Sequence, residues 1–152
     1  MIRLAAALAL LATPAAADLR IDHAMLRAAP AAVGGGYMVI HNDGPGDDVL
    51  LGAEAEVAEV QLHAMTMADG VMRMDAIPEI PLPAGEAVAL APGGLHLMLV
   101  GLEDGLREGD VHAVTLHFRD AGERVVEMPV RVFAEVRAAF ADVMAPMHGE
   151  GH

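Results

Sequence analysis

Two histidines and two methionines in the middle of the chain have the types and the spacing of a metal site. They are His63, Met74, His96 and Met98. Ten residues separate His63 from Met74, twenty-one separate Met74 from His96, and one separates His96 from Met98. Thioether sulfur prefers Cu(I) and imidazole tolerates it, whereas Ca²⁺ and Mg²⁺ require oxygen ligands. The four donors therefore predict a Cu(I) site, provided that the fold brings them together.

The segment that joins the first two donors predicts a β-hairpin. An Asp-Gly pair, which is a favoured hairpin turn, lies between HAMTM and VMRM. If the turn centres near Ala68 or Asp69, His63 and Met74 face each other to within a residue or so, and directly opposed Cβ atoms lie only about 5 Å apart. The alternative is a Met-rich amphipathic helix over 59–74, which the glycine and the β-branched residues disfavour.

The second pair of donors lies on an apolar strand expected over 95–102. Side chains on a strand alternate between its two faces, so His96 and Met98 point to the same side. The leucines at the alternate positions, Leu95, Leu97 and Leu99, are expected to face the core. This strand thus predicts two donors on one face and core residues on the other.

The rest of the chain predicts many short strands separated by turns, which favours an all-β sandwich or barrel. The expected strands cover 19–30, 37–41, 48–51, 57–65, 87–91, 95–102, 111–119 and 123–132. The glycine triplet 34–36 is expected to be a flexible connection. The sequence from Phe133 onwards changes character and predicts a short helix or a disordered extension.

The first seventeen residues have the order of a secretory signal: a basic start, the apolar run 4–12, a proline and three alanines. Cleavage there would leave Asp18 as the new N-terminus. The apolar run is too short to span a bilayer, and the alternatives are an uncleaved anchor or a buried helix. We therefore expect a signal peptide over 1–17, a metal-binding domain over 18–133 and an extension over 134–152, with no stable membrane insertion.

Composition excludes several classes of function. The chain contains no cysteine, which removes thiolate nucleophiles, Cys-ligated zinc sites and the thiolate of blue-copper centres. The net charge of −13 argues against nucleic-acid binding. The sequence has neither a G-x-S-x-G elbow nor an H-E-x-x-H zinc motif, so we do not expect an enzyme. One type of copper oxygenase uses an N-terminal histidine, whereas the predicted terminus here is Asp18.

The spacing of the four donors resembles the signature of the periplasmic copper chaperones called PCuAC, and it matches at every position. The segments YMVIHNDGPGDD, HAMTMADGVMRM and LPAGEAVALAPGGLHLMLVGL also resemble that family, and the resemblance runs over about 19–132. It implies a cupredoxin-like Greek-key β-sandwich or barrel that binds one Cu(I) through these four residues. It further implies a periplasmic role in supplying copper to the Cu(A) subunit of cytochrome c oxidase, with Sco-type proteins as partners. We expect the chain to act as a monomer. The alternatives are copper storage or detoxification, or a β-sandwich binding module without metal.

Further donors lie outside the four-residue set. Some PCuAC proteins resemble this chain in carrying a C-terminal extension with Met and His residues, which implies a second copper site that also takes Cu(II). Here its donors would be Met144, Met147, His148 and His152. On the hairpin, Met65 and Met72 are expected to form a rim of sulfur donors around the site. The remaining histidines, His23, His41, His112 and His117, are assigned to structural or surface roles.

Overall fold

The computed structural model describes residues 18–143 of the chain. The expected signal segment and the four donors of the C-terminal tail lie outside this part of the chain. Within residues 18–143, no helix is both long enough and apolar enough to cross a membrane.

Short strands dominate the described residues, and the expected all-β class is confirmed. The strands are β1 (Leu19–Arg27), β2 (Val33–Asn42), β3 (Asp48–Glu54), β4 (Glu59–Ala68), β5 (Val71–Ala76), β6 (Ile80–Leu82), β7 (Ala87–Leu90), β8 (Leu95–Val100), β9 (Val111–Phe118) and β10 (Gly122–Arg131). They are followed by one helix, α1 (Phe133–Ala139).

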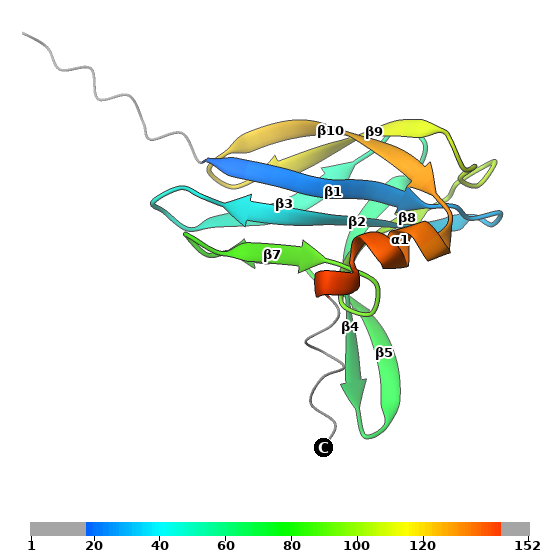
Figure 1. The fold of residues 1–152 in the computed structure, drawn as a ribbon, viewed down its shortest axis with the longest axis horizontal. Helices are drawn as coiled ribbons and strands as arrows, with labels where there is room; N and C mark the ends of the chain where they lie inside the picture. The colour runs from blue at the N-terminus through cyan, green and yellow to red at the C-terminus, as the bar shows by residue number, and fades with distance from the viewer. Residues whose placement is uncertain (1–17, 144–152) are drawn as a thin grey trace, which may run out of the picture.

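The strands form one sheet in the order β5-β4-β8-β2-β1-β10-β9-β3-β6, with β7 paired to β2 beside β8. All adjacent pairs are antiparallel except β1 and β10, which run parallel. The sheet is not closed, so β5 and β6 form its two edges. The β4–β5 hairpin projects well beyond the remaining strands (Figure 1).

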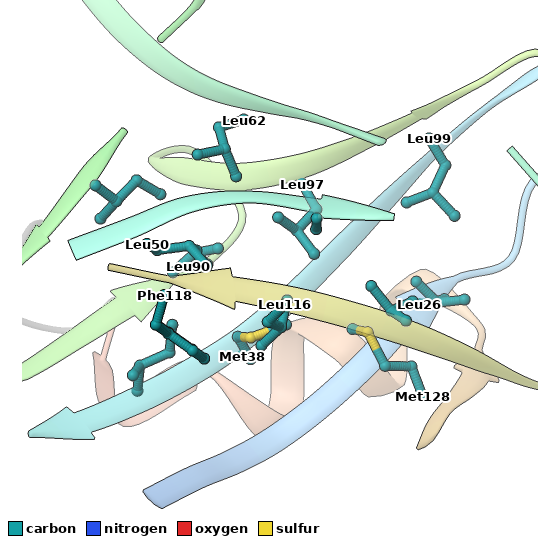
Figure 2. Packing of buried hydrophobic residues seen from close by; sticks show 14 of the residues in the cluster. Leu26, Met38, Leu50, Leu62, Leu90, Leu97, Leu99, Leu116, Phe118 and Met128 are labelled. Carbon is teal, nitrogen blue, oxygen red and sulfur yellow. The ribbon is translucent and has the colours of Figure 1, made fainter. Parts of the chain in front are cut away.

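The larger of two apolar clusters joins the two halves of the curved sheet. Side chains from β2 and β8, such as Met38 and Leu97, belong to the same buried cluster as Leu116 from β9 and Met128 from β10 (Figure 2). All four of these side chains are fully buried. The sheet therefore folds over on itself, and one face of β4 and β8 is left outside this core.

The glycine triplet 34–36 is not the flexible connection that the sequence predicted; it belongs to β2. A Cβ atom on Gly34 would lie 2.6 Å from a methyl carbon of Leu106, and one on Gly35 would lie 2.8 Å from the Tyr37 hydroxyl oxygen. Both distances are shorter than real Cβ contacts allow. The glycines are there because neighbouring side chains occupy the space on both faces of this strand.

Helix α1 covers part of the outer face of the sheet. Val136 and Phe140 are fully buried, and they form a second apolar cluster with Tyr37, Val39 and Ala91. The boundary expected at 133/134 thus falls at the start of a helix whose apolar side packs against β1 and β2. This second cluster places aromatic rings beside the strand that carries the predicted histidine–methionine pair.

Candidate metal centre

The β4–β5 hairpin turns at Asp69 and Gly70. Both residues have positive φ, 53° and 76°, as a type I′ turn requires. The strands therefore pair with Ala76 opposite His63 and Met74 opposite Met65.

The predicted face-to-face pairing of His63 with Met74 is consequently wrong by two residues. The reason is the turn, whose centre lies between Asp69 and Gly70 and not at Ala68 or Asp69. Because side chains repeat every two residues, the shift leaves both donors on the same face of the hairpin, as diagonal neighbours.

On its other side β4 pairs with β8, and this pairing brings the two histidines together. His63 lies directly opposite His96, and their ring centroids are 5.9 Å apart. Met98 lies two residues further along β8, opposite Gln61, on the same face as His96. The expected alternation of β8 is confirmed, because Leu97 and Leu99 are fully buried in the core on the opposite face.

Hydrogen bonds fix which nitrogen of each imidazole carries the proton. The Nε2 of His63 lies 2.9 Å from the amide oxygen of Gln61, whose own amide nitrogen donates to Glu59 at 3.0 Å. Since an amide oxygen only accepts, the His63 Nε2–H donates and its Nδ1 keeps a free lone pair. The Nδ1 of His96 likewise donates to the carbonyl oxygen of Gly94 at 3.0 Å, so Nε2 is the nitrogen of His96 that is left to act as a ligand.

This arrangement is typical of metal-binding histidines, in which the second ring nitrogen donates to a protein oxygen. The His63 Nδ1 is buried and has no hydrogen-bond partner among the described residues. A buried polar atom of this kind costs about 1–3 kcal/mol when it is left unsatisfied. Burial, and then the nearby His96, lower the pKa of His63, while Asp75 acts in the opposite direction. The neutral, ligating form of the His63 ring is therefore favoured.

The two methionines reach the same cavity from β5 and β8, the strands on either side of β4. Met74, His96 and Met98 line one surface cavity of about 300 Å³, together with Tyr37 and Gly35. Met98 is partly buried, whereas Met74 is 44% exposed. Three strands thus place all four predicted donors on one face of the sheet, but His63 is not among the residues that line the cavity. The two histidines are buried and Met74 is exposed to solvent.

The chemistry of this donor set points away from hard metal ions. Within residues 18–143, no group of three or more His, Asp and Glu side chains is placed to hold a metal ion. Two neutral imidazoles and two thioethers suit Cu(I). The residues present therefore fit a monovalent soft ion.

Sequence reasoning missed the residues that support the donors. Gln61 orients His63, and Tyr37 packs beside His96 with ring centroids 6.4 Å apart. Burial raises the pKa of Tyr37, with Arg27 acting against it, so the phenol stays protonated. The position of Gln61, two residues before His63 on the same strand, would have allowed its role to be predicted from the sequence. The role of Tyr37 depends on the pairing of β2 with β8, which the sequence does not show.

The other histidines lie elsewhere. His41 contacts Asp22 at 2.9 Å, and His117 lies between two glutamates, Glu54 and Glu123. His112 borders a separate surface pocket next to β3, and His23 packs edge-on against Phe140. None of the four joins the predicted donor set.

A family model described as putative lipoprotein LpqE-like matches residues 19–130. The chain belongs to this family. This LpqE-like chain is 33% identical over 118 residues to the putative lipoprotein Lxx21020 of Leifsonia xyli subsp. xyli. That alignment covers 76% of this chain and 71% of the relative.

Solved structures similar to the LpqE-like chain include PCuAC domains. The copper-bound PCuAC domain from PmoF2 is 28% identical with a TM-score of 0.65, covering 78% of this chain and 97% of that domain. The apo PCuAC domain from PmoF1 is 26% identical with a TM-score of 0.64, covering 75% and 93%. Apo-DR1885 from Deinococcus radiodurans is 26% identical with a TM-score of 0.60, covering 90% and 94%. The expected cupredoxin-like fold is confirmed.

Proposed function

We propose that this LpqE-like chain is an exported copper chaperone that binds one Cu(I) through His63, Met74, His96 and Met98. The main support for the proposal is the pair of facing imidazoles. In each ring one nitrogen donates a hydrogen bond to a protein oxygen, and the other nitrogen is left to bind a metal ion. Both imidazoles lie on the strand face that also carries the two thioethers. The similarity to a copper-bound PCuAC domain supports the same reading.

The donor set favours the lower oxidation state of copper. All four ligands are neutral, so they offset little of the charge of a divalent ion, and thioether sulfur selects Cu(I). Thioethers need no deprotonation, and the lowered pKa of His63 keeps its ring available as a ligand. Met74 lies at the solvent side of the site, where one ligand can leave before the others. This gradient of exposure suits a protein that takes up copper and passes it on.

We further propose the delivery role that the PCuAC resemblance implies. The recipient would be the Cu(A) subunit of cytochrome c oxidase, reached directly or through an Sco-type protein, with the chain acting as a monomeric carrier and not as an enzyme. Export to the periplasm is supported by the signal-like segment 1–17 and by the lipoprotein name of the Leifsonia relative. The alternative of copper storage or detoxification would use the same four donors.

The test is a competition titration with a Cu(I) chelator under reducing conditions. The double variant Met74→Leu/Met98→Leu keeps the side-chain volume and removes both sulfurs. Loss of an outer-shell partner typically weakens metal affinity by 10–100-fold, so loss of two direct ligands should weaken it by more than about 100-fold. The control Met25→Leu/Met128→Leu removes two sulfurs elsewhere and should bind as the wild type does. Equal affinity of all three proteins would refute the site.

The second site expected at Met144, Met147, His148 and His152 lies outside the described residues and stays a prediction. A chain that ends at Val143 keeps the buried residue Phe140, which directly follows α1, and removes all four tail donors. It should bind less Cu(II) per molecule than the full chain, while its Cu(I) affinity is unchanged. The same Cu(II) stoichiometry in both chains would contradict a copper role for the tail.

A further inference from the structure

The outer half of the β4–β5 hairpin carries four methionines on a single face. Met65 lies directly opposite Met74, and Met67 lies directly opposite Met72. The spacing of two along each strand puts all four side chains on the face that carries His63. We call these four residues the methionine ladder.

The backbone pairing brings the two methionines of each rung close together. In a hairpin with a two-residue turn, the residues that flank the turn form a hydrogen-bonded pair, and such pairs alternate with non-hydrogen-bonded pairs. The rungs at Met67–Met72 and Met65–Met74 fall in the second class. The backbone N–H of Met65 accordingly donates to Gly94 on the β8 side and not to β5. In pairs of this class the Cα atoms are only about 4.5 Å apart, and the side chains lie close together.

The rungs follow one another towards the candidate copper site. Successive rungs are two residues apart, which corresponds to about 7 Å along the strands. The inner rung shares Met74 with the cavity that contains His96 and Met98. Methionine side chains are long and flexible, so sulfur atoms on neighbouring rungs can approach one another. The ladder therefore forms an unbroken series of thioethers from the hairpin tip to the site.

Burial does not account for these side chains. Met67 is 69% exposed and Met72 is 56% exposed, and every residue of β5 is exposed. Methionine usually fills gaps in cores, and large apolar side chains that gather on a protruding surface indicate an interaction. The hairpin that carries them extends away from the rest of the sheet (Figure 1). The exposed sulfurs are thus available to a ligand in solution.

We propose that the methionine ladder is a second, weaker Cu(I) site that loads and unloads the four-donor site. The inference rests on the proposed copper function and assigns a role to Met67 and Met72, which that function does not use. Cu(I) would bind first between the sulfurs of the outer rung and then pass to the inner rung. At each step a new copper–sulfur bond forms before an old one breaks. The copper remains monovalent and no proton moves.

The variant Met67→Leu/Met72→Leu tests this proposal, because leucine preserves the volume and apolar character of the hairpin tip and removes only the sulfur. The full chain is first titrated with Cu(I) against a competing chelator. The uptake of Cu(I) from the same chelate is then followed by stopped flow. The control is again Met25→Leu/Met128→Leu, which lowers the methionine count equally but leaves the hairpin intact.

The experiment distinguishes a failure of the methionine ladder from a failure of the four-donor site. The tip variant should keep the wild-type affinity for the first Cu(I), lose a weaker second equivalent and take up copper at least about tenfold more slowly, equivalent to about 1.4 kcal/mol in the barrier. Wild-type uptake and stoichiometry in the tip variant would overturn the ladder and leave the four-donor site standing. Absence of tight Cu(I) binding in the wild type would instead overturn the proposed function.

Discussion

Gln61→Leu offers a sharp test of the candidate site, because Gln61 touches the proposed ligand His63 without being a ligand itself. Its amide oxygen accepts the His63 Nε2–H at 2.9 Å, and Glu59 holds the amide in that orientation. Leucine fills similar space but accepts no hydrogen bond. The His63 ring would then be free to rotate and to exchange its tautomer, which removes the fixed lone pair on Nδ1.

The size of the effect follows from this contact. Removing an outer-shell partner of a metal-binding histidine typically costs 10–100-fold in affinity, or about 1.4–2.7 kcal/mol. The hydrogen bond itself contributes about 1 kcal/mol to the stability of the metal-free protein. We therefore expect Gln61→Leu to weaken Cu(I) binding by about 10–100-fold, while the apo protein remains folded.

The assay is a chelator competition titration, with thermal unfolding of the apo protein measured in parallel. Gln61→Glu is the matched control, since a carboxylate still accepts from the Nε2–H, and it should retain most of the affinity. If Gln61→Leu binds Cu(I) as tightly as the wild type and its apo form is equally stable, His63 is not held by Gln61 for metal binding and the reasoning fails.

Two further results are expected. The pKa of His63 is lowered by burial, so below the usual value of about 6.5 the unfolded chain binds a proton that the folded chain does not, and stability should fall on acidification. Urea unfolding at pH 7 and pH 5 gives the decrease in the free energy of unfolding between the two pH values. This decrease should be smaller in His63→Leu than in the wild type, and equal decreases would contradict the prediction. Phe140→Ala should destabilise the fold by about 3–5 kcal/mol and remove a packing partner of Tyr37, because both side chains belong to the second apolar cluster. An unchanged melting temperature would show that α1 is not firmly packed.

Strand positions and the common face of the donors could be predicted from the sequence, because both depend on the two-residue period. The turn of the β4–β5 hairpin was misplaced, but a shift of its centre by one residue changes the register by two. Such a shift preserves the face on which His63 and Met74 lie. A local pattern therefore predicted the composition of the site although it missed the pairing.

Features that depend on distant contacts could not be predicted in this way. The glycine triplet 34–36 indicated flexibility, yet its real cause is the crowding by Leu106 and Tyr37, which no local pattern shows. Strand β6 was missed because its middle residue is Pro81, which is tolerated only because β6 lies at an edge of the sheet. The packing of α1 depends likewise on two apolar residues that meet β2, far away in the sequence.

The position of β5 at a sheet edge has a consequence for self-association. An edge strand offers unpaired amide and carbonyl groups to any extended chain that approaches, and apolar side chains make such templating more favourable. β5 spans only Val71–Ala76, and Arg73 and Asp75 alternate with its methionines. Short length and charge are the devices by which proteins discourage the growth of a sheet from its edge. The hairpin can thus expose its methionine side chains to solvent without promoting the growth of fibrils.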